Sequence, residues 1–359
     1  MQIYLVGGYV RDHFLRQELH YDIPEGDRDW VVVGSTPKEM RAKGFLPIGK
    51  DFPVFLDPKK HEEYALARTE RKIAPGYHGF RFHAAPEVTL EEDLKRRDLT
   101  INAIAMQGDT VFDPYHGICD IRNKVLRHVS DAFEEDPVRI LRVARFSAKL
   151  PEFSIAPETM NLMRQMVVNG EADALVPERV FLEMRKAFTH AHCDRFIQTL
   201  YTCGLGQKLF QNLNLTQELL AVLNKACLSE LDEAVKFAIL TSNVNSLETL
   251  NAFFDKFKPS SDIMDLCRLW LRSKDLFIST PEAMNTLFQT ADAFRRPERF
   301  QLLLCLATVF KNIDKTLWNR ALKAALSINA GEIASRCLNK KEIPLQLNAA
   351  RIAAIKDNL

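Results

Sequence analysis

The amino-acid pattern changes near residue 128, and this change constrains the fold more than any other feature of the chain. Before it, short runs rich in β-branched and aromatic residues indicate strands, with helical pieces such as TPKEMRAKG (36–44) between them. These runs are IYLVGG (3–8), WVVVG (30–34), PVFLD (53–57), EYALAR (63–68), TINAIAM (100–106) and TVFD (110–113). After residue 128 the spacing of apolar residues is helical. The pattern predicts an α+β fold in which an α/β domain precedes an all-helical part.

Helices are expected throughout that second part. Apolar residues recur there at three- and four-residue spacing, and Pro151, Pro259, Pro281 and Pro297 punctuate the pattern. The expected helices lie at 137–150, 177–190, 195–210, 216–228, 230–241, 246–257, 261–272, 281–293, 298–310, 316–327 and 346–356.

The charge balance of the whole chain is nearly even, with 48 basic and 47 acidic side chains. Any site for a polyanion must therefore be a local patch. The seven cysteines are scattered without a CxxC pair, which favours free thiols in a reducing compartment. The N-terminus lacks a signal-peptide pattern, and the longest apolar run, Phe300 to Phe310, is too short to span a bilayer. We therefore expect a soluble cytoplasmic protein with no membrane segment.

A glycine pair joins the first expected strand to a helix in LVGGYVRD (5–12). Glycines allow a ligand to approach the backbone closely. The helix N-terminus and Arg11 would then supply hydrogen-bond donors for a phosphate. A purely structural turn explains Gly7 and Gly8 equally well, so this motif needs support from its surroundings.

Two carboxylates, Asp27 and Asp29, stand two residues apart at the start of the strand WVVVG. In an extended segment residues i and i+2 point the same way, so both carboxylates project from one face. Like charges this close are costly unless a cation lies between them, and Mg²⁺ prefers such oxygen ligands. A metal held there would serve phosphoryl or nucleotidyl transfer. A polar turn is the plainer interpretation of the pair alone, and the glycine turn upstream favours the metal site.

Two further stretches could complete such a site. Glu63 opens the run EYALAR in register with its apolar alternation, and it is the predicted third catalytic carboxylate. The stretch KRRDLTINAIAM (95–106) places Arg97 beside an apolar run, and a guanidinium there suits triphosphate oxygens. Ordinary solvated charge is the alternative for both.

The stretch EEDPVRILRVARF (134–146) predicts a mostly buried helix that carries a stripe of charge. Asp136 is the expected N-cap, ahead of a proline at the first helical position. Arg139, Arg142 and Arg145 recur every three residues among apolar side chains, so they require anionic or polar partners. Intramolecular ion pairs or a bound nucleotide would both supply such partners.

Asp136 and Arg139 can also select a base. A carboxylate accepts from an exocyclic amine and a guanidinium donates to the adjacent ring nitrogen, which matches cytosine and adenine. Uracil and guanine present a carbonyl and a ring N–H instead, and they would leave buried polar groups unpaired. This pair could thus accept CTP and ATP and reject UTP and GTP without a nucleic-acid template.

Six motifs in this order resemble the class II tRNA nucleotidyltransferases, the bacterial CCA-adding enzymes. They are LVGGYVRD, DRDWVVVG, EEYALARTERK, RRDLTINA, DPYHG and EDPVRILRVARF. The resemblance, dense over residues 1–190, implies a Mg²⁺-dependent enzyme that adds and repairs the 3′-terminal CCA of tRNA with CTP and ATP and releases pyrophosphate. It also implies a polymerase-beta-like nucleotidyltransferase head at 1–128, a helical neck at 129–192, a helical body at 193–280 and a tRNA-binding tail at 281–359.

The resemblance further implies a role for each site residue. Asp27 and Asp29 would bind Mg²⁺ and activate the 3′-hydroxyl of a tRNA held by its 3′ end and its acceptor and T arms. Asp136 and Arg139 would act as the protein template for C and A. The residues that would bind ATP and CTP are Gly8, Arg11, Arg97, Asp136, Arg139, Arg142 and Arg145. No membrane contact and no protein partner is implied.

Narrower activities remain open at this point. The related bacterial poly(A) polymerases share part of the motif set, and an enzyme that adds only A or only C would carry the same catalytic residues. A non-catalytic RNA-binding protein is expected to have lost Asp27, Asp29 or Arg139, and all three are present. No histidine follows His192, so residues 193–359 lack the His-Asp metal site of the HD phosphohydrolase domain that many relatives carry.

The region from residue 281 onward carries a mild excess of basic side chains, twelve against seven acidic ones. Such side chains could hold the tRNA backbone, where phosphate contacts position without specifying sequence. Ordinary solvated helix faces explain the same pattern. The residues concerned include Arg295, Arg296, Arg299, Lys340 and Lys341.

Overall fold

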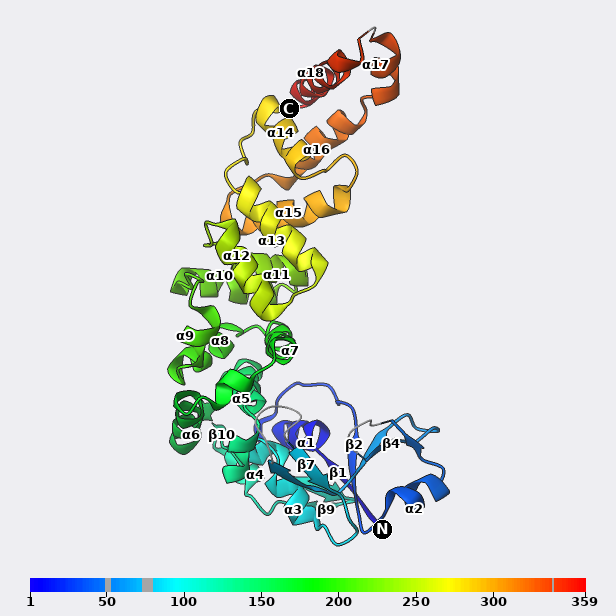
Figure 1. The fold of residues 1–359 in the computed structure, drawn as a ribbon, viewed down its shortest axis with the longest axis vertical. Coiled ribbons are helices and arrows are strands. Elements are labelled where there is room, and N and C mark those ends of the chain that lie inside the picture. Colours follow the sequence, from blue (N-terminus) through cyan, green and yellow to red (C-terminus); the bar gives the residue numbers. More distant parts are fainter. Residues whose placement is uncertain (49–52, 73–79, 338) are drawn as a thin grey trace. The chain divides into compact units, whose positions relative to one another are not determined.

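The computed structural model describes residues 1–48, 53–72, 80–337 and 339–359 of the chain. Internal contacts divide the chain into two compact units, each described here by itself. The first unit comprises residues 1–187 and 195–209, and the second comprises 188–194 and 210–359. In the described residues all strands belong to the first unit, and helices alone make up the second (Figure 1). The predicted α+β class and its order are confirmed, while the division into head, neck, body and tail stays a prediction.

A seven-stranded mixed sheet forms the base of the first unit. β2 and β5 run parallel, and every other neighbouring pair is antiparallel. In spatial order the strands are β3 (Leu46–Pro47), β4 (Val54–Leu56), β5 (Glu63–Leu66), β2 (Asp29–Val33), β1 (Gln2–Val6), β8 (Ala105–Gln107) and β9 (Thr110–Phe112). Two small ribbons accompany it, formed by β6 (Thr69–Lys72) with β7 (Phe80–His83), and by β10 (Val125–Leu126) with β11 (Ser154–Ile155).

Each face of the sheet has its own apolar cluster, because successive side chains of a strand point to opposite faces. Val31 packs with Tyr4 and Val6 in one cluster. Val32, the next residue of β2, packs with Phe55 in the other. Both faces are thus covered, which explains why β2 is a continuous run of valines.

The helices of the first unit surround this sheet and continue beyond it. They are α1 (Gly8–Leu19), α2 (Pro37–Ala42), α3 (Leu90–Lys95), α4 (Gly117–Arg122), α5 (Val138–Lys149), α6 (Pro157–Val168), α7 (Pro177–Ala187), α8 (Asp194–Thr202) and α9 (Leu205–Phe210). The 3-10 turns are η2 (Thr100–Asn102), η3 (Asp131–Glu135) and η4 (Glu171–Ala174).

Three local predictions need correction. The expected strand at 100–106 is a 3-10 turn in its first half, and only its end contributes to β8. The expected helix at 195–210 is two helices, since Gly204 adopts a left-handed backbone with φ of 88° between them. Helix α5 begins at Val138, with Pro137 as the N-cap residue, although the Asp136 carboxylate still accepts the Val138 N–H at 3.0 Å.

The second unit is a stack of helices with an aromatic core. Phe288 lies within 5.1 Å of Phe300 and 6.0 Å of Trp318 between ring centroids, and all three side chains are buried. Its helices are α10 (Gln217–Leu228), α11 (Glu233–Leu240), α12 (Leu247–Phe257), α13 (Ser261–Ser273), α14 (Pro281–Thr290), α15 (Pro297–Phe310), α16 (Lys315–Leu326), α17 (Ala330–Arg336) and α18 (Ile343–Lys356), with the 3-10 turn η5 (Lys340–Glu342). α6 and α17 were not anticipated.

Two further features of the sequence can be compared with the structure, namely its cysteines and its apolar segments. All seven cysteines are free thiols, as predicted. A search of the described residues finds no helix with the length and apolar character needed to cross a membrane.

Candidate active site

A cavity of about 480 Å³ opens in the first unit, where the start of α1, the start of β2, the segment after α3 and helix α5 meet. Its lining is mostly charged, with seven arginines against three aspartates, so it suits a strongly anionic ligand. The lining residues are Gly7, Gly8, Arg11, Asp29, Arg96, Arg97, Asp98, Asn102, Asp136, Arg139, Arg142, Arg145, Phe146 and Arg179.

The predicted glycine turn forms one edge of this cavity. Val6 pairs with Asp29 across β1 and β2, so the turn that follows β1 lies beside the start of β2. Gly7 has φ of 73°, and a Cβ atom there would lie 3.4 Å from Asp29 Oδ2 and 3.7 Å from Arg97 Nη1. A side chain at this position would be strained by the left-handed backbone, although its Cβ would make only ordinary contacts with both groups. The backbone conformation of this turn therefore favours glycine.

The carboxylates gather where β2 meets β5. Asp29 and Glu63 are direct partners in the parallel register of these strands. Burial raises the pKa of Asp29 above its ordinary value; the Arg97 charge lowers it, and the charges of Glu63 and Asp27 raise it again. In the described part of the chain no three His, Cys, Asp or Glu side chains come close enough to hold a metal by themselves. The local excess of negative charge nevertheless fits a divalent cation.

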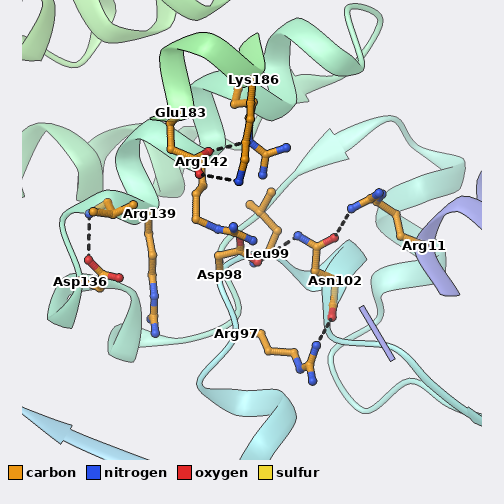
Figure 2. Close-up of polar contacts among 12 residues, drawn as sticks. Arg11, Arg97, Asp98, Leu99, Asn102, Asp136, Arg139, Arg142, Glu183 and Lys186 are labelled. Carbon is orange, nitrogen blue, oxygen red and sulfur yellow. Dashed lines mark hydrogen bonds and ion pairs between the residues drawn. The ribbon is translucent and has the colours of Figure 1, made fainter. Parts of the chain in front are cut away.

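A chain of hydrogen bonds crosses the floor of the cavity (Figure 2). Arg11 Nη1 donates to Asn102 Oδ1 at 2.8 Å, and Asn102 Nδ2 donates to Asp98 Oδ1 at 2.9 Å. Arg142 Nε donates to Asp98 Oδ2 at 2.7 Å. Burial alone would raise the pKa of Asp98, but the Arg142 charge and the hydrogen bonds hold that pKa well below its ordinary value. Asp98 therefore stays ionised and anchors α5 against the segment after α3.

Arg97 is held at the cavity edge with part of its donor capacity unused. Its Nη2 donates to the fully buried Asp93 at 3.2 Å, and its Nη1 contacts the Asn102 carbonyl at 3.4 Å. Its Nε is buried and has no hydrogen-bond partner in the described structure. A buried donor without a partner is costly, so this arrangement fits a ligand that supplies an acceptor.

The base-selecting pair predicted on α5 lies at the other end of the cavity. The buried Arg139 guanidinium donates to two backbone carbonyls, those of Ala132 at 2.5 Å and Arg96 at 2.7 Å. Asp136 contacts Arg179 of α7 at 3.6 Å. Six residues after Arg139, Arg145 Nε donates to the buried Glu183 of α7 at 2.6 Å. Helices α5 and α7 thus pack together through the stripe of charge.

Eight of the ten predicted site residues line this one cavity. Asp27 and Glu63 do not line it, although their charges act on Asp29. The structure tests where these residues lie and leaves their roles as predictions. The lining residues that the sequence reasoning missed include Asn102, Phe146 and Arg179. A polar residue inside the apolar run TINAIAM was a usable signal for Asn102, because a buried amide needs partners.

Two family profiles match parts of the chain. The Poly A polymerase head domain family matches residues 3–127, and the family described as probable RNA and SrmB-binding site of polymerase A matches residues 152–216. The first covers the sheet and the turn at its edge. The second covers α6 to α9.

Relatives and solved structures match nearly the whole chain. The chain is 44% identical to a CCA-adding enzyme of Bordetella bronchiseptica, over 99% of this chain and 96% of the relative. It is 42% identical to a multifunctional CCA protein of Azoarcus sp., over 99% and 97%. The fold is similar to a CCA-adding enzyme in its apo form II, with a TM-score of 0.73, 20% identity and coverage of 99% and 90%. It is also similar to the Bacillus stearothermophilus CCA-adding enzyme in complex with CTP, with a TM-score of 0.69, 22% identity and coverage of 99% and 89%.

Proposed function

This chain belongs to the CCA-adding enzyme family, and we propose that it builds and repairs the 3′-terminal CCA of tRNA from CTP and ATP, releasing pyrophosphate. One observation carries the proposal. The carboxylate edge at Asp29, the arginines at the glycine turn and the Asp136–Arg139 pair all line one cavity of nucleotide size. A single bound nucleotide can therefore meet a phosphate site and a base-reading site at once.

The carboxylate edge is the proposed metal site. Nucleotidyltransferases generally use divalent metal ions, and oxygen ligands next to a phosphate site favour Mg²⁺. Asp27 and Asp29 would hold it, because Asp29 opens β2, Asp27 lies two residues before it, and the crowding of their charge with that of Glu63 fits a cation. When bound, Mg²⁺ favours ionisation of the attacking hydroxyl and neutralises charge on the phosphoryl oxygens. Glu63 stays a proposed third carboxylate.

The glycine turn and two arginines position the triphosphate. Helix α1 begins at Gly8, and the backbone N–H groups of its first turn favour binding of an anion. Arg11 and Arg97 reach the same cavity from α1 and from the segment after α3. Their guanidiniums are already oriented by protein partners, so little reorganisation accompanies binding. The tRNA 3′-hydroxyl would then attack the α-phosphate in line, with pyrophosphate leaving.

The start of α5 would read the base. Two backbone carbonyls hold the Arg139 guanidinium, and the Val138 N–H holds the Asp136 carboxylate. A held acceptor and a held donor discriminate strongly, because a mismatched base would leave buried polar groups unpaired. Cytosine and adenine match this pair, and uracil and guanine do not. Base choice would thus reside in the protein, in the cytoplasm where tRNA is used.

The alternatives are narrower transferases. Addition of A only, addition of C only, and poly(A) synthesis would all use the same carboxylates and triphosphate site. The match to the Poly A polymerase head domain covers the catalytic part and does not separate these activities. The two relatives described above, which match over nearly the whole chain, are a CCA-adding enzyme and a multifunctional CCA protein, and this favours full CCA addition.

The deciding experiment is an incubation series with purified protein and Mg²⁺. tRNA lacking CCA, tRNA ending in C and tRNA ending in CC are each supplied with CTP, ATP or both, and products are resolved to single nucleotides. Addition of C, C and A followed by a stop is expected. A long A tail, or addition of one base type only, would replace the proposal with one of the narrower activities. A product made equally well from UTP would remove the base-reading role of α5.

A further inference from the structure

Asn102 lines the cavity and contacts three of the charged residues there (Figure 2). Its amide oxygen accepts from Arg11 at 2.8 Å, its amide nitrogen donates to Asp98 at 2.9 Å, and its backbone carbonyl accepts from Arg97 at 3.4 Å. The residue is 6% exposed. It is the last residue of the turn η2.

The chemistry of this position requires an amide. A cation lies on one side of Asn102 and an anion on the other, so the bridging group must both accept and donate. The orientation of the amide follows, since the reverse orientation would set donors against the guanidinium and an acceptor against the carboxylate. Arg11 is also held by Asp12, through Nε at 2.7 Å and Nη2 at 2.7 Å. Three of its five N–H groups are thus engaged, and the others can face a ligand.

We propose that Asn102 is a positioning residue that ties the phosphate-binding guanidinium of Arg11 to the base-selecting helix α5 through Asp98 and Arg142. This inference rests on the proposed nucleotide-binding function. Arg142 Nε donates to Asp98 at 2.7 Å, so the link continues without a gap from α1 to α5. The Asn102 amide therefore fixes the position of the Arg11 guanidinium relative to α5. It thereby fixes the distance between the phosphate-binding site and the base-selecting site.

Three single variants test this inference, with equilibrium binding of CTP in the absence of tRNA as the first measurement. Asn102→Ala removes both amide bonds, and we expect roughly tenfold weaker CTP binding because Arg11 loses a partner that orients it. Asn102→Asp keeps an acceptor for Arg11 but replaces the donor to Asp98 with a second carboxylate, so the link to α5 is broken and CTP binding is expected to weaken at least as much as in Asn102→Ala. The matched control is Thr100→Val, which removes a buried 2.7 Å bond to Asp120 in the same turn without touching the cavity.

The outcomes separate positioning from a general structural effect. Weaker binding in both Asn102→Ala and Asn102→Asp with normal binding in Thr100→Val supports the inference. Equal losses in Asn102→Ala and Thr100→Val would overturn it, as would unchanged binding in Asn102→Ala. Normal binding in Asn102→Asp would also overturn it, because the link to α5 through Asp98 would then not be needed. Thermal unfolding of each variant verifies that the chain is folded.

A double variant gives the sharpest test. Two residues that act through one contact do not add their effects. In an Arg11→Ala background, Asn102→Ala is therefore expected to weaken CTP binding by less than about twofold more. A full additional tenfold loss would mean that Asn102 acts by another route. Extension of tRNA by the unchanged protein is measured in parallel: its absence would defeat the proposed function, whereas normal extension with normal CTP binding in Asn102→Ala defeats this inference alone.

Discussion

The two units of this chain differ in what they bury. Among the described residues, every buried acidic or basic side chain lies in the first unit. These are Arg11, Asp12, Asp93, Asp98, Asp120, Arg139 and Glu183. The buried polar side chains of the second unit, besides its cysteines, are neutral: Thr241, Ser242, Ser273 and Asn285. Because burying charge is costly, its confinement to the unit with the cavity points to a site that must be held rigid.

The second unit has a mainly apolar interior. Aromatic and aliphatic side chains fill it, and none of the unit's described basic side chains is buried. Arg295 pairs with Asp292 at 2.8 Å and is 77% exposed, which is a pair of small energetic weight. Arg299, which the sequence offered as a tRNA contact, instead forms a two-bond contact with Asp265. The comparison teaches that charge builds the site in one unit and that apolar packing builds the framework in the other.

The largest effect is expected at the carboxylate edge. Asp29→Asn removes a proposed metal ligand, and nucleotide addition should fall by about a thousandfold or more. Binding of tRNA should change little, because the second unit is untouched. The measurement is single-turnover addition of C to tRNA, with Asp109→Asn in the exposed β8–β9 turn as control. Substantial turnover in Asp29→Asn would overturn the metal assignment.

The second prediction concerns the aromatic core of the second unit. Phe288→Ala opens a cavity among Phe300 and Trp318 and should cost about 3–5 kcal/mol of the stability of the second unit. The preference for CTP over UTP should not change. Denaturant unfolding measures the first quantity, and the exposed Thr286→Ala on the same helix serves as control. A changed preference for CTP over UTP would show that packing in the second unit also influences base selection in the first.

A partly buried ion pair links stability to pH in the first unit. Asp98→Asn leaves Arg142 without its anion and should cost about 1–3 kcal/mol at neutral pH, because the Arg142 side chain is 35% exposed and its charge is partly screened by solvent. Because Arg142 and the hydrogen bonds depress the folded-state pKa of Asp98, the charged carboxylate stabilises the fold above its unfolded-state pKa of about 3.9, and this stabilisation is lost as the pH falls below that value. Unfolding at pH 7 and pH 3 should therefore show a difference that shrinks in acid. If the difference in unfolding free energy between the two proteins is the same at both pH values, the Asp98–Arg142 pair does not contribute to the pH dependence of stability.

A smaller effect is expected at the base-reading end. Arg139→Ala should lower the preference for CTP over UTP by roughly tenfold to a hundredfold, because the donor to the ring nitrogen is lost. Competition between the two nucleotides on tRNA lacking CCA measures this ratio. The control is Arg122→Ala, which removes an exposed arginine of α4 that pairs with Glu18. An unchanged ratio would show that Arg139 does not read the base.

The smallest effect is expected on the surface of the second unit. Lys340 and Lys341 are exposed, and joint replacement by alanine should weaken tRNA binding only a few-fold while lowering the salt slope by about 1 to 2. Stability and base choice should stay the same. Binding at two salt concentrations checks this, with the exposed Lys225→Ala of α10 as control. An unchanged salt slope would remove this surface from the tRNA-binding proposal.

Much of the site was predictable because its motifs are short. The alternation in EYALAR placed Glu63 at the start of β5, and the structure sets it opposite Asp29. The three-residue spacing on α5 predicted that Arg139, Arg142 and Arg145 share a stripe, and all three line the cavity. The run at 100–106 was misjudged as a strand because its apolar residues outweighed Asn102 in the pattern, whereas the buried amide contacts coincide with a tighter turn.

Residue order alone carries the local information: the break near 128, the strands and helices on either side of it, and the groups that could hold a phosphate, a metal or a base. Periodicity and capping act over a few residues, so they can be read without a fold. The ion-pair partners of the charged groups, in contrast, are distant in the sequence. Arg142 pairs with Asp98, 44 residues before it, and Arg145 with Glu183, 38 residues after it. Only the tertiary structure decides such pairs, because chain folding, and not spacing, brings buried opposite charges within hydrogen-bond distance.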